Sequence, residues 1–428
     1  MNILIKSAKI IDTNSEHHNK IMDIFIKKGK IEKIAKSIKS CPKSIANGSE
    51  IEYTAENLHL SPGWFDLHVN FGEPGFEKNE TFDTGKKAAI KGGFTGVMVM
   101  PNNIPNIDNK NMINFIKNAS KGSIIDIIPS GNITKGGKGN EIVEMHDMNN
   151  AGCNVFTDDK KSIIRNEVMK IAMLYSKDSN TVIMNYPNDK SIANNGFMNE
   201  GKTSTILGLK GIPSLAEEMM IDRDLSLCEY TNCQLHISYI SVRNSIKKIK
   251  AAKKKGLNVT TDVAIHNLFL TDKFVNNFDT RYKVLPPLRT NKDNKALIKA
   301  LKDDTIDVIC SDHSPISNEY KKIDFDNAAY GIIGLETAFG LLGKYLLPEI
   351  DLVSLIEKIS SNPRKILKIK EVTIKEGENA NLTLFNPVLE WKFSSKDIKS
   401  KSFNTPFIGE ILKGKALAIY NNGQFKEC

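Results

Sequence analysis

The sequence lacks long apolar runs and paired cysteines. No stretch reaches the ~18 apolar residues that a membrane helix needs. The opening residues, MNILIKSAKIIDT, have no long apolar core of the kind found in signal peptides. Six cysteines are scattered along the chain with no C-x-x-C pair. We therefore expect a cytoplasmic protein with free thiols that neither enters nor crosses a membrane.

Histidine is also scarce. The basic residues are in excess but are not clustered in one part of the sequence. The 428 residues include eight histidines, and 59 Lys and Arg against 50 Asp and Glu give a net charge of +9. Nucleic-acid binding requires basic residues gathered in a stripe or interleaved with aromatics, whereas these lysines are spread along the whole chain. No nucleic-acid partner is expected.

The two ends of the chain share an alternating apolar and polar texture. Residues 1–58 contain NILIKSAKIID and MDIFIKKGKIEKIAKSI, with a turn at Lys27–Gly29. Residues 370–428 contain NANLTLFNP and GEILKGKALAIYNNGQF, with Asn422-Gly423 typical of a hairpin turn. This pattern predicts one small β-sandwich-like domain, built from residues 1–58 plus 370–428.

Residues 59–369 follow a different rhythm, in which short apolar runs alternate with helical segments. Such a series predicts a (β/α)8 TIM barrel, an α/β fold whose chemistry sits at the C-terminal ends of the strands. The runs are Gly63–His68, Phe94–Met100, Ile124–Pro129, Cys153–Thr157, Thr181–Asn185, Gln234–Tyr239, Leu257–Val263 and Thr305–Ser311.

The predicted strand ends carry the candidate functional residues. His68 and Asn70 are two residues apart in an extended segment, so both side chains should face the barrel mouth. The other strand ends carry Asp158, Asn185, Tyr239 and Asp312. A catalytic zinc site needs about three protein ligands. The predicted strand ends carry too few histidines for a histidine-rich two-metal site.

Several long motifs, in the same order along nearly the whole chain, resemble dihydroorotases of the amidohydrolase superfamily. They are SPGWFDLHVNFGEPGFEKNETFDTGKKAAIKGGFTGVMVMPN, FTDD, LHISYISVRNSI, VTTDVAIHNLFLTD, YKVLPPLR, DVICSDHSP, GIIGLETAFG and NTPFIGEILKGKALAIYNNG. The resemblance implies an amidohydrolase-type TIM barrel with a small β domain formed by both termini, and a place in pyrimidine biosynthesis.

Carried over onto this chain, the family's metal site is incomplete. The resemblance implies that His68, Asp158 and Asp312 keep metal-ligand positions, with Asp312 also the position of the general base. Histidine ligands are replaced at Asn70, Asn185 and Tyr239. An amide is a weak zinc donor, and tyrosine ligates only as phenolate, with an ordinary pKa near ~10.

The family's substrate contacts are depleted as well. The arginine that holds the substrate carboxylate falls on Gly72, and two further contact positions fall on Leu285 and Ile316. Asn102 is kept, and Arg289 is a second candidate for holding a ligand. Losing an arginine fork removes a bidentate clamp on a carboxylate.

These losses together predict a catalytically impaired or inactive dihydroorotase homologue with no cofactor. By family precedent it would act as a structural partner, for example of aspartate carbamoyltransferase, and we also expect a homo-oligomer. One alternative is an active dihydroorotase or related cyclic-amide hydrolase with one zinc, manganese or iron ion on His68, Asp158 and Asp312. Another is a metal-free sensor that binds a pyrimidine precursor.

Overall fold

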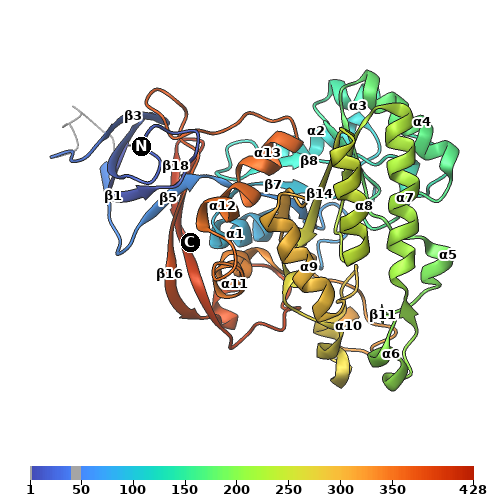
Figure 1. Cartoon of the computed structure of the whole chain (residues 1–428). Helices are drawn as coiled ribbons and strands as arrows, with labels where there is room; N and C mark the ends of the chain where they lie inside the picture. Colours follow the sequence, from blue (N-terminus) through green and yellow to red (C-terminus); the bar gives the residue numbers. More distant parts are fainter. Residues whose placement is uncertain (1, 40–49) are drawn as a thin grey trace.

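The computed structural model of the protein describes residues 2–39 and 50–428, so Cys41 lies outside the described residues. A β domain containing both termini lies beside a larger barrel whose helices form its outer wall (Figure 1). The five cysteines in the described part of the chain are free thiols. No helix among the described residues combines the length and apolarity needed to span a bilayer.

All eight predicted barrel strands are present. They form a three-stranded parallel sheet, β6-β7-β8, and a five-stranded parallel sheet, β15-β14-β13-β10-β9. Parallel bridges Gly131–Phe156 and Val69–His313 join the two sheets and close the barrel. The strands are β6 (Trp64–Val69), β7 (Phe94–Val99), β8 (Asp126–Pro129), β9 (Val155–Phe156), β10 (Val182–Asn185), β13 (Gln234–Ile237), β14 (Val259–Ala264) and β15 (Val308–Cys310).

Helices follow the barrel strands in turn and cover them from outside (Figure 1). The longer ones are α1 (Phe82–Gly92), α2 (Lys110–Ala119), α4 (Asn166–Asp178), α7 (Ser214–Thr231), α8 (Arg243–Lys254), α9 (Asn291–Lys302), α11 (Ala338–Tyr345) and α12 (Leu352–Ile359). Shorter elements are α3 (Met145–Asn150), α5 (Lys190–Ala193), β11 (Met198–Asn199), α6 (Lys202–Leu207), β12 (Gly211–Ile212), α10 (Asn318–Lys321) and α13 (Ser361–Ile366).

Local sequence explains where these helices begin and end. Thr81 caps the start of α1, exchanging hydrogen bonds with Thr84 in a capping box. Gly93 ends the same helix with φ +83°, a left-handed conformation that glycine adopts without strain. Thr290 and Asp293 form the equivalent box at the start of α9.

The β domain is an eight-stranded sheet drawn from both ends of the chain. Its order is β18-β17-β16-β5-β1-β2-β3, with β4 also pairing β1. The predicted turns at Lys27–Gly29 and Asn422-Gly423 connect antiparallel neighbours. The strands are β1 (Asn2–Ile10), β2 (Ile21–Lys27), β3 (Lys30–Ala35), β4 (Glu50–Tyr53), β5 (His59–Pro62), β16 (Leu382–Lys392), β17 (Ile411–Asn421) and β18 (Gln424–Glu427).

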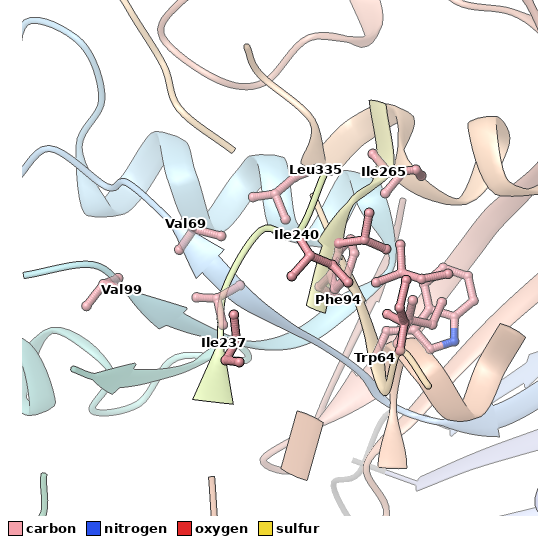
Figure 2. Close-up of a cluster of buried hydrophobic side chains, with 14 of the residues drawn as sticks. Trp64, Val69, Phe94, Val99, Ile237, Ile240, Ile265 and Leu335 are labelled. Atoms are coloured by element: carbon pink, nitrogen blue, oxygen red, sulfur yellow. The ribbon is translucent and has the colours of Figure 1, made fainter. Parts of the chain in front are cut away.

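One apolar cluster connects the barrel to the β domain. The Trp64 ring lies 4.6 Å from that of Phe339 on α11 and 5.4 Å from that of Phe385 on β16, between ring centroids. Figure 2 shows Trp64 in this cluster with Val69, Phe94, Val99, Ile237, Ile240, Ile265 and Leu335. Burial of so many large side chains on both sides of the strands holds the barrel mouth in a fixed geometry.

Candidate functional site

The innermost polar group of the site is Asp262, in the middle of β14. One of its carboxylate oxygens, Oδ2, lies 2.6 Å from His68 Nε2 and 2.7 Å from His236 Nε2. The other oxygen, Oδ1, accepts the Tyr239 backbone N–H at 2.7 Å. Each of these four side chains is at most 1% exposed. The sequence-predicted His68 is thus held by an aspartate that the strand-end reasoning did not include.

The two charged partners shift each other's protonation. Burial opposes ionisation of Asp262, but the charge of His68 and the hydrogen bonds from His236 and His68 hold its pKa well below the ordinary range. Burial likewise lowers the pKa of His68, and the charge of Asp262 outweighs it, so the net shift is upward.

Tyr239 lies over this group with its ring centroid 4.2 Å from that of His68. Its backbone has φ +55°, and its hydroxyl is buried without a hydrogen-bond partner among the described residues. Burial raises the pKa of Tyr239 well above 10.0. Burial therefore favours the neutral phenol over the phenolate.

Lys160 also lies close to this aromatic ring and pairs with the strand-eight aspartate. Its Nζ is 4.9 Å from the Tyr239 ring centroid, and 2.6 and 2.8 Å from the two carboxylate oxygens of Asp312. Asp312 is fully buried. Burial raises the pKa of Asp312, while the charge of Lys160 counteracts part of that rise.

The aspartate expected at the metal, Asp158, instead fastens the loop that follows β8. Its Oδ1 accepts the backbone N–H groups of Ile133 and Thr134 at 2.9 and 3.1 Å, and the Asn132 amide at 3.1 Å. Its Oδ2 accepts the Thr134 hydroxyl. Burial raises the pKa of Asp158, and these hydrogen bonds oppose that shift.

The next residue, Asp159, shares the site with Lys160. Its Oδ2 accepts the amide of the predicted ligand-binding residue Asn102 at 3.0 Å, and its Oδ1 is buried without a partner among the described residues. Burial raises the pKa of Asp159; the positive charge of Lys160 lowers it, and the negative charge of Asp312 raises it. The ammonium of Lys160 thus partly offsets the negative charge of two buried carboxylates, Asp159 and Asp312.

Two other sequence-predicted residues are drawn away from the mouth. Asn185 donates to Asp224 of α7 at 2.7 Å, and Arg223 holds the other oxygen of that carboxylate. Arg289 is 3% exposed and donates to Ser241, to Asn199 and to the Ile212 carbonyl. The side chains of Asn185 and Arg289 are therefore used in hydrogen bonds that hold the fold together.

A pocket of about 490 Å³ opens above the Lys160–Asp312 pair. Asn70 lines it, donating to Ser314 at 3.1 Å and leaving its own carbonyl oxygen buried without a partner among the described residues. His266 lies beneath, with Nε2 3.9 Å from Asp312 Oδ2. Burial, helped by the charge of Lys160, lowers the pKa of His266 to about 3, so the ring is neutral.

The residues present fit a metal ion poorly. In the described part of the chain, the one group of three side chains close enough to hold a metal is His68, His236 and Asp262. Tetrahedral zinc with bonds near ~2.0–2.1 Å holds its donors roughly 3.3 Å apart. Here each nitrogen lies within 2.7 Å of the same oxygen, which is hydrogen-bonding distance.

The predicted set of His68, Asp158 and Asp312 does not form such a group. Lys160 and Asp262 were not predicted from the sequence, and at the FTDD strand end, which carries both Asp158 and Asp159, the metal-ligand position was assigned to Asp158. Asp262 had a signal, an acidic residue inside the apolar run VTTDVA, where a charge must find a partner. Lys160 had none, because its partner Asp312 is 152 residues away.

A closed parallel barrel joined to a β domain from both termini is also the architecture of solved hydantoinases. An L-hydantoinase (dihydropyrimidinase) from Arthrobacter aurescens superposes with a TM-score of 0.84 at 20% identity, covering 99% of this chain and 95% of that one. A structure titled D-hydantoinase gives a TM-score of 0.83 at 21% identity with the same coverage. The fold is the amidohydrolase-type TIM barrel with its small β domain.

Sequence relatives define the family more narrowly. The family model "Dihydro-orotase-like" matches residues 58–245. A dihydroorotase of Thermoanaerobacter sp. (strain X514) is 40% identical over 100% of this chain and 97% of that protein. A dihydroorotase of Caldicellulosiruptor saccharolyticus is 39% identical over 99% and 97%. The chain belongs to the dihydroorotase family.

Proposed function

We propose that this protein is a dihydroorotase homologue of pyrimidine biosynthesis that does not hydrolyse dihydroorotate, and that it acts in the cytoplasm as a structural partner of another enzyme of the pathway. Aspartate carbamoyltransferase is the partner we propose. The main observation that supports the proposed absence of hydrolysis is the pairing of Lys160 Nζ with both oxygens of Asp312.

That ion pair removes the base from the reaction. By resemblance Asp312 is the residue that would take a proton from the attacking water, and the ammonium of Lys160 occupies the oxygens that would accept it. Below the pair, His68 and His236 share the Asp262 carboxylate at hydrogen-bonding distance. Without a metal, water keeps a pKa near ~15.7 rather than ~7, and no hydroxide is available at neutral pH.

The pocket also lacks a clamp for the substrate carboxylate. Gly72 stands at the position of the family's arginine, and Arg289 is buried in a network with Ser241, Asn199 and the Ile212 carbonyl. Two lysines line the pocket: Lys160 is already paired with Asp312, and Lys161 is exposed and makes no ion pair among the described residues. A dihydroorotate carboxylate that approached Lys160 would therefore compete with Asp312 for the same ammonium.

The first test is hydrolysis. Purified full-length protein, prepared without chelators, should show no dihydroorotate hydrolysis above the buffer rate, with or without added zinc or manganese. Elemental analysis of the same sample should find well under one metal ion per chain. A relative with all its histidine ligands serves as the positive control. Hydrolysis at ordinary enzyme rates would overturn the proposal.

The second test is partner binding. Co-expression with the aspartate carbamoyltransferase of the same cell should yield a complex that survives size-exclusion chromatography. The activity of aspartate carbamoyltransferase in this complex should differ from the activity of the same enzyme expressed without this chain. Two separate elution peaks with unchanged activity would contradict the partner role while leaving the first part intact. Calorimetry with dihydroorotate and carbamoyl-aspartate tests the alternative of a metal-free sensor, which predicts saturable heat without hydrolysis.

A further inference from the structure

A second cavity lies at the opposite end of the barrel from the mouth, where the barrel meets the β domain. Its volume is about 600 Å³. The β domain contributes the turns at Lys28-Gly29 and 421–423 and the segment 369–381. The barrel contributes Phe65 of β6, the start of β8 and Arg364 of α13. Ligand sites of ~300–1,000 Å³ occur preferentially between domains.

Arg364 forms the charged floor of this cavity. Its side chain is 4% exposed, and its guanidinium lies 5.3 Å from the Phe65 ring centroid. Nη2 donates to the Gly63 carbonyl at 3.1 Å and to the Thr95 hydroxyl at 3.2 Å. Nε is buried with no hydrogen-bond partner in the described part of the chain. Donor capacity on the guanidinium therefore remains unused.

Arg364 also has no carboxylate within ion-pairing distance among the described residues. The carboxylate whose charge acts on the pKa of Arg364 is Asp126. Its two oxygens accept hydrogen bonds from the amides of Asn421 at 3.0 Å and Asn422 at 2.9 Å. A buried cation without a counter-charge is costly, so an anion at this position is favoured.

The surroundings add donors. Asn381, which is 8% exposed, accepts the Thr95 hydroxyl on its Oδ1 at 2.7 Å, and its amide nitrogen donates to no other described residue. On the rim, Lys28 and Lys117 take part in no ion pair within residues 2–39 and 50–428, although Lys117 Nζ donates to the Ala151 carbonyl at 2.7 Å. Two acids also line the rim: Glu378 lies 3.6 Å from Lys370 and is partly neutralised, whereas Glu371 takes part in no ion pair among the described residues. The cavity thus offers N–H groups to an acceptor-rich ligand.

We propose that this cavity binds a small organic anion through a carboxylate or phosphate head, with Arg364 and Asn381 at the head group and Lys28 and Lys117 at its outer end. Arginine is the side chain best suited to these two head groups. The ligand would bridge the two domains, because its contacts come from α13 on one side and from the segment 369–381 on the other. This site is independent of the proposed function.

The test titrates the full-length protein with inorganic phosphate and, separately, with succinate by isothermal calorimetry at low ionic strength. We expect saturable binding of at least one of them. Arg364→Lys keeps the charge but loses most of the donors, and should weaken binding at least about tenfold. The exposed double variant Lys28→Gln/Lys117→Gln should weaken it about three- to tenfold. Lys177→Gln, on the outer face of α4, is the matched control.

Hydrogen exchange with and without the anion locates the site. Protection of residues 369–381 and 421–423 is expected. Protection of residues 70–79 and 158–161 would assign the anion to the barrel mouth and overturn the proposal. Absence of saturable binding of both anions would do the same. If circular dichroism shows that Arg364→Lys does not fold, the Lys28→Gln/Lys117→Gln variant decides, because both side chains lie at the surface.

Discussion

Lys160 Nζ lies 2.6 and 2.8 Å from the two oxygens of Asp312, and the carboxylate is fully buried. The charge of the same ammonium also acts on Asp159, where it opposes the rise in pKa that burial causes. One lysine therefore compensates two acidic groups at the centre of the barrel mouth.

Removing this lysine should destabilise the fold strongly. Lys160→Met leaves Asp312 buried without its partner, which typically costs about 3–5 kcal/mol. Chemical denaturation should show this loss, and the double variant Lys160→Met/Asp312→Asn should recover part of it because neither charge remains. Lys161→Met is the control, since that neighbour is exposed, with an expected change within about 0.5 kcal/mol. Equal stability of Lys160→Met and the parent protein would contradict the pairing.

Asp262 should control how stability responds to pH. The folded-state pKa of His68 is raised, so its contribution is full below pH 6.5 and is lost as pH rises through the raised value. In Asp262→Asn the effect of burial becomes dominant and lowers the pKa of His68. The slope of unfolding free energy between pH 6 and pH 8 should then become more positive than in the parent protein. Denaturation curves across that range check this, and an unchanged slope would contradict it.

Asp262 also makes a contribution of its own at acid pH. Because its folded-state pKa is lowered, the stabilisation is present above the ordinary value of 3.8 and is lost as pH falls below it. The difference in unfolding free energy between the parent protein and Asp262→Asn should therefore shrink on acidification from pH 5 to pH 3. A difference that stays constant over this interval would mean that the carboxylate is not ionised in the folded protein.

Lys321 should give the opposite pH dependence. Its amine is 3% exposed and donates to the Thr280 and Lys283 carbonyls, and burial lowers its pKa from 10.5 to about 7. Between these values the unfolded chain binds the extra proton, so stability rises with pH, by at most about 1.4 kcal/mol per pH unit. Lys321→Met should remove this rise between pH 7 and pH 9. The exposed neighbour variant Lys322→Met should leave it intact.

An exposed apolar face on α4 and α7 predicts self-association. The two helices pack side by side on the outer wall of the barrel (Figure 1). This face exposes seven large apolar side chains, each 39–74% exposed, and large exposed apolar patches mark protein–protein contact sites. Its side chains are Ile164, Ile171, Leu174, Tyr175, Leu215, Met219 and Tyr230.

We expect a second copy of the chain to cover this face. Sedimentation should show a dimer, and Leu174→Glu/Met219→Glu should convert it to a monomer because both side chains point into solvent on adjacent helices. Val388→Glu, an exposed apolar position on β16 of the β domain, is the control and should leave the dimer unchanged. A parent protein that sediments as a monomer at micromolar concentration would refute the expectation.

The architecture was predictable because it depends on local patterns. Each barrel strand is a short apolar run, and the β-domain hairpins have turn residues at Lys27–Gly29 and Asn422-Gly423. Both signals are read within a few residues of one another. Strand order and closure then follow from the regular alternation of strand and helix.

The site was less predictable because it depends on which way a side chain points and what it meets. Asn185 ends β10 as expected, yet its amide bonds Asp224 on α7. Asp158 and Asp159 are adjacent, but only the structure shows that Asp158 binds the Ile133 backbone whereas Asp159 interacts with the charge of Lys160. Such pairings join residues far apart along the chain, and no local pattern encodes them.

The loop at Gly72 limits how this chain can change. Its backbone has φ +39°, and a Cβ there would lie 2.6 Å from the Phe76 carbonyl oxygen and 2.7 Å from that of Glu80. No side chain fits without moving that backbone, so a point substitution at this position does not by itself add an arginine to the pocket. The carbonyls of Phe76 and Glu80 must move first, which means that the loop has to be rebuilt as a unit. Grafting the corresponding loop of a relative is therefore a better engineering route than a single substitution.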